Sequence, residues 1–481
     1  MGSPTQSAWR RAGPWALAAV CTGWALVVGL WEPASLALPF DDAWYYQTIA
    51  RHLAAGDGFT HDGLQVTNGF HPLWQLLLVP VVALADGLGT DGIMRVTLVL
   101  QIILAFGGLV VLDRRLPGIA LAGAVGLTNP YAFKAVVGGM ESALLFALLA
   151  LAVAQLERWQ KKGAAVPSGL LLGAIALTRL EALAFVVAAL GFLARDDRKL
   201  AFRTAAVVLV PVGLWTALAF GTFGTPIPVS GQHLSGAPRM GRAMVVGAVW
   251  LVLAPVALRL LRRTPLVAAL AFHVAVQLAY VGTFQGRWLP SLWYLAPALL
   301  FAAIAAVTLS VRLPRFAVPA FVVLWLLGAS FAWMHRVDPA SYSSYVGARH
   351  DGQWLARHLA DGEWAAGWDI GIVAARAGGR VANLEGLVAA PDFDPADVPG
   401  FLNAHPEIRY LVQFVRQGHL CHQEPLRYGG IELEHLPLVR TESVAFRAAD
   451  PRMSTTVHRM IFDLRGDAAV DVARIRRRAC E

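Results

Sequence analysis

The chain has 481 residues, of which 57% are hydrophobic and 15% charged, and its mean hydropathy is +0.54. Charged residues make up about 25% of an ordinary soluble domain, so this composition excludes one and indicates an integral membrane protein. The formal net charge of +8 comes largely from arginines in short loops. In a membrane protein such loops indicate orientation and contact with anionic lipid headgroups, and we expect no nucleic-acid partner.

The apolar runs predict a succession of membrane-spanning helices, each of which needs about 20 residues. The first run follows Arg10 and Arg11, as in a signal peptide. No convincing cleavage site follows it and the chain stays hydrophobic, so we interpret it as a retained helix. Candidate spans begin near Trp15, Leu73, Ile93, Pro117, Met140, Val166, Leu180, Thr204, Ala243, Leu266, Leu289 and Phe316.

Positively charged loops orient the chain, because Lys and Arg concentrate on the cytoplasmic side. They predict a cytoplasmic amino terminus and an external carboxy terminus, which together require an odd number of crossings. Either one segment between Leu73 and Val137 is short or re-entrant, or the run after Pro117 breaks at Asn129-Pro130. The sequence therefore predicts eleven or thirteen crossings. The loops that orient the chain are 158–162, 195–199, 259–263 and 312–315.

The composition changes near residue 335. Residues 1–335 are predicted to form a transmembrane catalytic domain, and residues 336–481 an extracytoplasmic α/β domain. Cys421 and Cys480 both lie in the second part and could pair if it faces an oxidising compartment. The patterns in this part predict helices at 353–359 and 401–405 and strands at 380–384 and 410–415.

The first outer loop, residues 33–72, carries two adjacent carboxylates, Asp41 and Asp42, after the first apolar run. One Asp at the centre of a membrane helix costs roughly 3 kcal/mol, so the pair must lie at the interface or in a watery cavity. An acid pair at the membrane edge is a candidate functional site. In the alternative interpretation, Asp42 is only the N-cap of the helix that follows.

Further polar residues gather on the same predicted outer side. Glu141 lies there, and Arg179 and Glu181 separate two apolar runs so closely that their charges must lie at or below the interface. These two either bind substrate or pair with neighbours to make a tight hairpin tolerable. His71 precedes Pro72 and either belongs to the site or simply starts a helix. The outer side also includes Gln232, His233 and Arg287.

This set of residues predicts group transfer from a lipid phosphate at the outer membrane edge. A carboxylate would remove the proton from an acceptor hydroxyl, and Arg side chains would hold the phosphate and stabilise its developing charge. A single base suffices if the configuration of the sugar carbon inverts. Trp44, Tyr45 and Tyr46 would stack on sugar rings, or else belong to an interfacial aromatic belt.

The residues of the first outer loop do not identify a cofactor. A divalent cation is an alternative, with ligands drawn from Asp41, Asp42, His61, Asp62 and His71. Their irregular spacing differs from that of common metal sites and argues against it.

Three segments of the first outer loop, Asp41–Tyr46, Ala50–Thr60 and Asn68–Trp74, resemble the corresponding loop of bacterial GT-C fold glycosyltransferases. Those enzymes use polyprenyl-phosphate sugars and include protein mannosyltransferases, aminoarabinose transferases and mycobacterial arabinofuranosyltransferases. Gly139–Ser142 resembles their second acidic motif, and Arg179–Glu181 resembles their Arg-Pro-Glu turn with Leu in place of Pro. The tail segments that also match are Trp354–Ala356, Trp368–Gly371 and Asn383–Leu387.

The resemblance implies a polytopic helical protein with a GT-C-like fold, and it favours thirteen crossings. It also implies an inverting transferase whose base is Asp41, assisted by Asp42 and Glu141. One departure concerns the stretch after Gly224, where the family often has Pro-Asn-Ser/Thr followed by Lys. This chain has Pro226–His233 instead, which leaves open whether Gln232 or His233 replaces that Lys at the phosphate.

The leading hypothesis is a glycosyltransferase of a bacterial plasma membrane that moves a sugar from a polyprenyl-phosphate donor to an envelope glycan, lipid or protein. Its partners would be the lipid donor, the envelope acceptor and membrane lipids. The main alternative is a transporter or lipid-sugar flippase, a class that tends to keep charges near the midplane on repeated, broken helices. A non-catalytic envelope assembly factor is the third hypothesis, and it predicts tolerance of Asp41→Ala.

Overall fold

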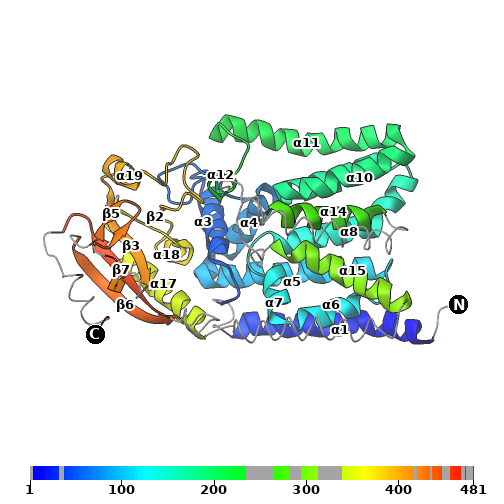
Figure 1. Cartoon of the computed structure of the whole chain (residues 1–481), viewed down its shortest axis with the longest axis horizontal. Helices are drawn as coiled ribbons and strands as arrows, with labels where there is room; N and C mark the ends of the chain where they lie inside the picture. The colour runs from blue at the N-terminus through cyan, green and yellow to red at the C-terminus, as the bar shows by residue number, and fades with distance from the viewer. Residues whose placement is uncertain are drawn as a thin grey trace.

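Helices dominate the first two thirds of the chain, and a β-sheet dominates the last third (Figure 1). The computed structural model describes residues 4–31, 37–234, 265–280, 294–312, 339–416, 420–421, 423, 425–433, 436–446, 455–466, 472 and 480. The predicted spans near Ala243 and Phe316 and the loop 259–263 lie outside these residues. The number of crossings therefore stays a prediction.

The apolar runs form helices close to where the sequence predicts them. Four helical stretches in the described ranges are long and apolar enough to cross a membrane: Ala12–Leu30, Pro72–Asp113, Ser142–Lys161 and Arg198–Phe223. The helices of this part are α1 (Pro4–Leu30), α3 (Asp41–Ala55), α4 (Pro72–Ala85), α5 (Gly89–Asp113), α6 (Ile119–Leu127), α7 (Pro130–Val136), α8 (Ser142–Lys161), α9 (Ala165–Thr178), α10 (Leu183–Asp196), α11 (Arg198–Phe223), α12 (Val229–Leu234), α14 (Pro265–Tyr280) and α15 (Ala296–Arg312), with short 3₁₀ turns η1 (Asp86–Leu88) and η2 (Leu180–Ala182).

The run after Pro117 breaks at Asn129 into two short helices, α6 and α7, and the choice between the two predicted alternatives stays open. The Asn129 side chain accepts hydrogen bonds from the backbone N–H groups of Tyr131 (3.0 Å) and Ala132 (3.4 Å). Pro130 occupies the first turn of α7, where its missing N–H costs nothing. A side-chain cap and a proline together therefore end α6 and start α7.

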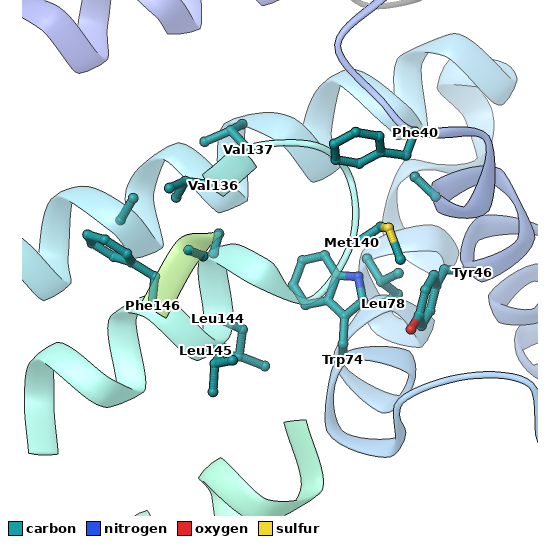
Figure 2. Packing of buried hydrophobic residues seen from close by; sticks show 14 of the residues in the cluster. Phe40, Tyr46, Trp74, Leu78, Val136, Val137, Met140, Leu144, Leu145 and Phe146 are labelled. Atoms are coloured by element: carbon teal, nitrogen blue, oxygen red, sulfur yellow. The ribbon is translucent and has the colours of Figure 1, made fainter. Parts of the chain in front are cut away.

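The short helix α3 lies between the helical bundle and the sheet (Figure 1). Its residues Ala43–Ala50 are buried, and it ends at Gly56, whose φ of 90° only glycine adopts without strain. Figure 2 shows Tyr46 of α3 beside Trp74 and Met140 in the buried apolar cluster. The Trp74 indole N–H donates to the Gly139 carbonyl at 3.2 Å. Packing of this kind fixes α3 against α4 and the loop before α8.

The C-terminal region is a mixed α/β structure, as the alternating patterns predict. The order of its five-stranded sheet is β2-β1-β3-β7-β6, in which β1 runs parallel to β2 and β3 and β7 runs antiparallel to β3 and β6. The boundary predicted at residue 335 lies outside the described residues and stays a prediction. The elements are α17 (Pro339–His358), β1 (Trp364–Gly367), α18 (Gly371–Arg376), β2 (Val381–Asn383), α19 (Val398–Ala404), β3 (Ile408–Arg416), β4 (Arg427–Tyr428), β5 (Ile431–Glu432), β6 (Leu438–Phe446) and β7 (Thr455–Asp463).

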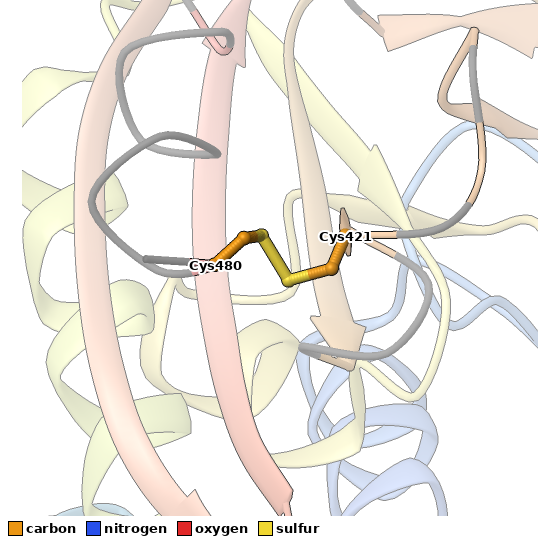
Figure 3. Close-up of a disulfide and its surroundings, with 2 residues drawn as sticks. All are labelled: Cys421 and Cys480. Atoms are coloured by element: carbon orange, nitrogen blue, oxygen red, sulfur yellow. A yellow bond between two sulfur atoms is a disulfide. The ribbon is translucent and has the colours of Figure 1, made fainter.

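A disulfide joins Cys421 to Cys480 across 59 residues of the C-terminal region (Figure 3). This is the pairing that the sequence predicts for an oxidising compartment. The bridge links the segment after β3 to the end of the chain.

The Cys480→Ser variant should unfold more easily, because the open chain gains conformational entropy worth about 4 kcal/mol for a loop of this length. Thermal unfolding of the purified protein, followed by circular dichroism, measures the effect. Adding reductant should lower the unfolding temperature of the wild type and leave that of Cys480→Ser unchanged. A wild-type unfolding temperature that ignores reductant would contradict the bridge.

Candidate active site

Asp41 is the first residue of α3, and Asp42 is the second. The residue before them, Phe40, is the N-cap, and no side chain caps this helix. The alternative in which Asp42 is only the N-cap of the following helix is therefore wrong. Both Asp41 and Asp42 are partly exposed, so the start of α3 is reachable from solvent although the rest of the helix is buried.

The Asp41 carboxylate instead binds the start of a different helix, α18. Oδ2 accepts a hydrogen bond from the Gly371 N–H at 2.8 Å, and Oδ1 accepts one from the Ile372 N–H at 3.2 Å. The first N–H groups of a helix have no partner within it, so a carboxylate placed there satisfies both. Each carboxylate oxygen is thus held in place by a residue more than three hundred positions further along the chain.

The electrostatic environment of Asp41 is acidic. The pKa of Asp41 is raised to about 6: burial and charge repulsion from Asp369 raise it, and the N–H groups of Gly371 and Ile372 and the charge of Arg459 lower it. Burial and the neighbouring Asp369 also raise the pKa of Glu385 well above its usual range. Glu385 is therefore a neutral acid at pH 7, whereas Asp41 is largely ionised.

Tyr45 lies one turn after Asp41 and joins the same group. Its hydroxyl oxygen accepts from the Ile370 N–H at 3.3 Å and from the Asn383 side-chain amide at 3.0 Å. We call Asp41, Tyr45, Asp369 and Glu385 the Asp41 cluster. The other aromatic candidate, Trp44, is fully buried, and the Arg376 guanidinium lies 5.9 Å from its ring centre.

A second cluster forms around Glu141, which is fully buried. The Arg179 Nη1 donates to Glu141 Oε1 at 2.6 Å, and the Arg179 Nε donates to Glu181 Oε1 at 2.5 Å. The Arg179 guanidinium also lies 4.4 Å from the centre of the Tyr294 ring. The ion pair that the tight-turn interpretation predicts is therefore present, and the substrate-binding part of Arg179 and Glu181 stays a prediction.

His71 and Tyr46 complete this second group. His71 is the N-cap residue of α4 with Pro72 after it, as the helix-start interpretation predicts. Its Nε2 also lies 3.7 Å from Glu141 Oε1. The Tyr46 hydroxyl donates to Glu141 Oε2 at 3.0 Å and accepts from the His71 N–H at 3.1 Å. We call Glu141, Arg179, Glu181, His71 and Tyr46 the Glu141 cluster.

The predicted site residues that make these contacts thus form two groups: the Asp41 cluster at the start of α3, and the Glu141 cluster, which α3 joins through Tyr46. Successive helix residues point about 100° apart, so Tyr45 faces the Asp41 cluster while Tyr46 faces the Glu141 cluster. Asp369 and Glu385 were not among the residues predicted from the sequence. They occur in the tail segments Trp368–Gly371 and Asn383–Leu387 that resemble GT-C enzymes, and this was the signal for them.

The loop after α11 is held by the first outer loop. The Asn68 amide donates to the carbonyls of Thr225 (3.2 Å) and Ile227 (3.0 Å), and its Oδ1 accepts from the Val229 N–H at 2.9 Å. These bonds fix the start of α12, on which Gln232 and His233 lie. The side chains of these two residues, and all of Arg287, lie outside the part that the structure describes.

The metal alternative gains no geometric support within the described ranges. No group of three or more His, Cys, Asp or Glu side chains there is arranged to hold a metal ion. His71, one of the proposed ligands, lies in the Glu141 cluster, whereas Asp41 lies in the other.

Two solved structures share this architecture. ArnT from Cupriavidus metallidurans, bound to undecaprenyl phosphate, is similar with a TM-score of 0.56 at 16% identity, over 94% of this chain and 98% of that one. An oligosaccharyltransferase from Archaeoglobus fulgidus has a TM-score of 0.52 at 12% identity, over 87% and 71%. No protein-family model and no curated protein matches the sequence.

Both of these proteins are glycosyltransferases of the GT-C class. The apolar helices and this likeness define the chain as a membrane protein with the GT-C fold. The fold that the motifs of the first outer loop predict is therefore confirmed.

Replacing Arg179 with Gln should destabilise the fold by about 3 kcal/mol, because it leaves the buried carboxylates of Glu141 and Glu181 without their cation. The measurement is the thermal unfolding midpoint of the purified protein in detergent. The matched control is Arg195→Gln, since Arg195 is exposed at the end of α10. Equal midpoints for the two variants would show that the ion pairs contribute nothing to stability.

Proposed function

We propose that this protein is a membrane glycosyltransferase that moves a sugar from a polyprenyl-phosphate donor to an envelope acceptor, with Asp41 as general base. The observation that carries this proposal is the Asp41 carboxylate itself. It is partly exposed, both of its oxygens are oriented by backbone N–H groups, and its pKa is raised to about 6. A base with a pKa just below the working pH is ionised and still accepts a proton readily. The likeness to ArnT bound to undecaprenyl phosphate supports a lipid-phosphate donor.

The proposed reaction is a single displacement at the sugar. The acceptor hydroxyl oxygen bonds to the anomeric carbon while its proton passes to Asp41. The bond between that carbon and the phosphate oxygen breaks, and polyprenyl phosphate leaves with the electron pair. One displacement inverts the configuration, and its oxocarbenium-like transition state needs only one base.

The other residues take supporting parts in this proposal. Asp42 orients Asp41, and Glu141 assists by fixing Tyr46 and Arg179 behind α3. In this proposal the Arg179 guanidinium stabilises the charge of the donor phosphate, His71 is a polar contact beside it, and Glu181 orients Arg179. The further substrate-binding candidates are Trp44, Tyr45, Gln232, His233 and Arg287.

The proposed location is a bacterial plasma membrane with the site on the outer face. The cationic loops support a cytoplasmic amino terminus, and the disulfide in the C-terminal region supports an oxidising outer compartment for that region. The sheet region would then cover the acceptor side of the site from outside.

Asp41→Asn should reduce turnover by at least about 100-fold, because it removes the basic oxygen while keeping the size of the side chain. The assay incubates purified protein with a panel of polyprenyl-phosphate sugars and candidate acceptors and measures released lipid phosphate. Donor binding should change little.

The matched control is Asp57→Asn in the same outer loop, since Asp57 is exposed and bonds to His52. It should retain wild-type turnover. Near wild-type transfer by Asp41→Asn would remove Asp41 as the base. Movement of lipid-linked sugar across vesicles without phosphate release would favour the transporter alternative.

Asp369→Asn should move the acidic limb of the kcat/KM profile to lower pH by about 0.5 to 1 unit, because a nearby like charge raises a carboxyl pKa. The sign follows from the base being active when ionised: a lower Asp41 pKa keeps it ionised in more acidic solution. Asn also tolerates the φ of 51° found at Asp369. The pH dependence of lipid-phosphate release measures the shift.

Glu385→Gln is the control for this experiment. Glu385 is held neutral by burial and by Asp369, so a neutral amide should leave the limb in place. If the acidic limb shifted in Glu385→Gln but not in Asp369→Asn, then Glu385 and not Asp369 would carry the charge that acts on Asp41.

A further inference from the structure

Helix α18 of the C-terminal region is held at both ends by one helix of the membrane region, α3. At its start, Asp41 accepts hydrogen bonds from the N–H groups of Gly371 and Ile372. At its end, the Arg51 guanidinium donates to the Ala375 carbonyl at 3.5 Å. An acid at the first N–H groups and a cation at the last carbonyls is the charge pattern that stabilises a helix. Helix α18 therefore contacts α3 at both of its ends, although α3 has 15 residues and α18 six (Figure 1).

The start of α5 reinforces the same contact. The Thr90 hydroxyl donates to the Ala375 carbonyl at 3.3 Å and accepts from Arg51 at 3.0 Å. Asp91 forms an ion pair with Arg376, the last residue of α18. Two helices of the membrane region, α3 and α5, thus fix a helix of six residues, which makes its position relative to Asp41 well defined.

Gly371 allows the closest approach between the two helices. A Cβ built at this position would collide with the Asp41 carbonyl oxygen and would lie 2.8 Å from its Oδ2. The glycine is needed for space and not for an unusual backbone angle, because its φ is not in the left-handed range. Any side chain here would push α18 away from the carboxylate.

Tyr45 supports the turn that leads into α18. Its hydroxyl holds the Ile370 N–H, directly before Gly371, and the Asn383 amide at the end of β2. Both Tyr45 and Ile370 are buried. The turn is thus tied to α3 one helical turn away from the reacting carboxylate.

We propose that α18 is a positioning element for the catalytic base: the C-terminal region orients Asp41 through the N–H groups of Gly371 and Ile372, and the base is competent only while that region is docked. Gly371, Ile372 and Tyr45 are positioning residues, since they act through Asp41. This inference rests on the proposed function, in which Asp41 removes the acceptor proton. It gives the C-terminal region a part in the rate of transfer that is separate from any part in binding.

The charged groups around Asp41 determine how loss of its contact with α18 would change the pH dependence of activity. Asp369 and burial raise the Asp41 pKa, and Arg459 and the two N–H groups lower it. Loss of the N–H bonds should therefore raise the pKa and move the acidic limb to higher pH. The remaining titratable neighbours are Asp42, Tyr45, Tyr345 and Glu385.

The test compares Gly371→Ala with Gly87→Ala in the full-length protein. A Cβ at Gly87 meets nothing within 4 Å, so that variant should behave as wild type. We expect Gly371→Ala to lower kcat by about 10-fold or more, because a small displacement of a reacting group is costly. The donor KM should stay unchanged, and the acidic limb should move to higher pH. Wild-type kcat and an unmoved limb in a folded Gly371→Ala protein would overturn the inference.

Tyr45→Phe decides the question if Gly371→Ala does not fold. The ring and its packing remain, and only the oxygen that holds the turn is lost. We expect kcat to fall by about 3-fold or more with an unchanged donor KM, on the scale of one lost buried hydrogen bond. A raised donor KM with unchanged kcat would make Tyr45 a sugar contact and overturn its positioning role. A wild type that releases no lipid phosphate from any donor would instead overturn the proposed function.

Discussion

A carboxylate that leaves bulk water must find donors or a cation, since an unpaired buried charge costs several kcal/mol. Two carboxylates next to or on α3 are satisfied in two different ways. Glu141 is fully buried and takes a guanidinium from Arg179. Asp41 is partly exposed and takes two backbone N–H groups from α18. These bonds connect α3 to the sheet region and Arg179 to the loop that carries Glu141.

The two solutions have different chemical consequences. The Glu141 carboxylate accepts from the Arg179 guanidinium on one oxygen and from the Tyr46 hydroxyl on the other. At Asp41, the neutral N–H groups of Gly371 and Ile372 lower the pKa of the carboxylate, and the negative charge of Asp369 raises it. The pKa of Asp41 is raised to about 6, while Glu141 serves as an anchor for Arg179, Tyr46 and His71. This environment supports our proposal that Asp41 is the base, independently of its place in a motif.

Much of this architecture was predictable from local sequence patterns. Apolar runs predict the helices, Asn129-Pro130 predicts the break between α6 and α7, and alternating patterns predict strands β2 and β3. The proximity of Glu141 to Arg179 also follows, because both were placed on one side of the membrane. These features depend on neighbours in sequence or on the sign of a loop charge.

The contacts that complete the Asp41 cluster depend neither on neighbours in sequence nor on the sign of a loop charge. Gly371 and Asp41 are 330 residues apart, and periodicity carries no information about such a pairing. From the sequence, Arg179 was expected either to bind substrate or to pair with neighbours, and its partners in the structure are Glu141 and Glu181. Only the docked tertiary structure brings the α18 N–H groups to Asp41 and leaves Arg179 to the other cluster.

One short turn of the C-terminal region therefore acts on Asp41 in two opposing directions. Asp369 raises its pKa, and the N–H groups two and three residues later lower it. The left-handed backbone at Asp369 lets its N–H donate to Glu385 while the chain turns into α18. Because both effects come from one rigid segment, undocking the sheet region removes them together and frees the carboxylate to rotate. The proton affinity of the base and its orientation are thus set by the same contact, which is why we place the control of catalysis at the junction of α3 and α18.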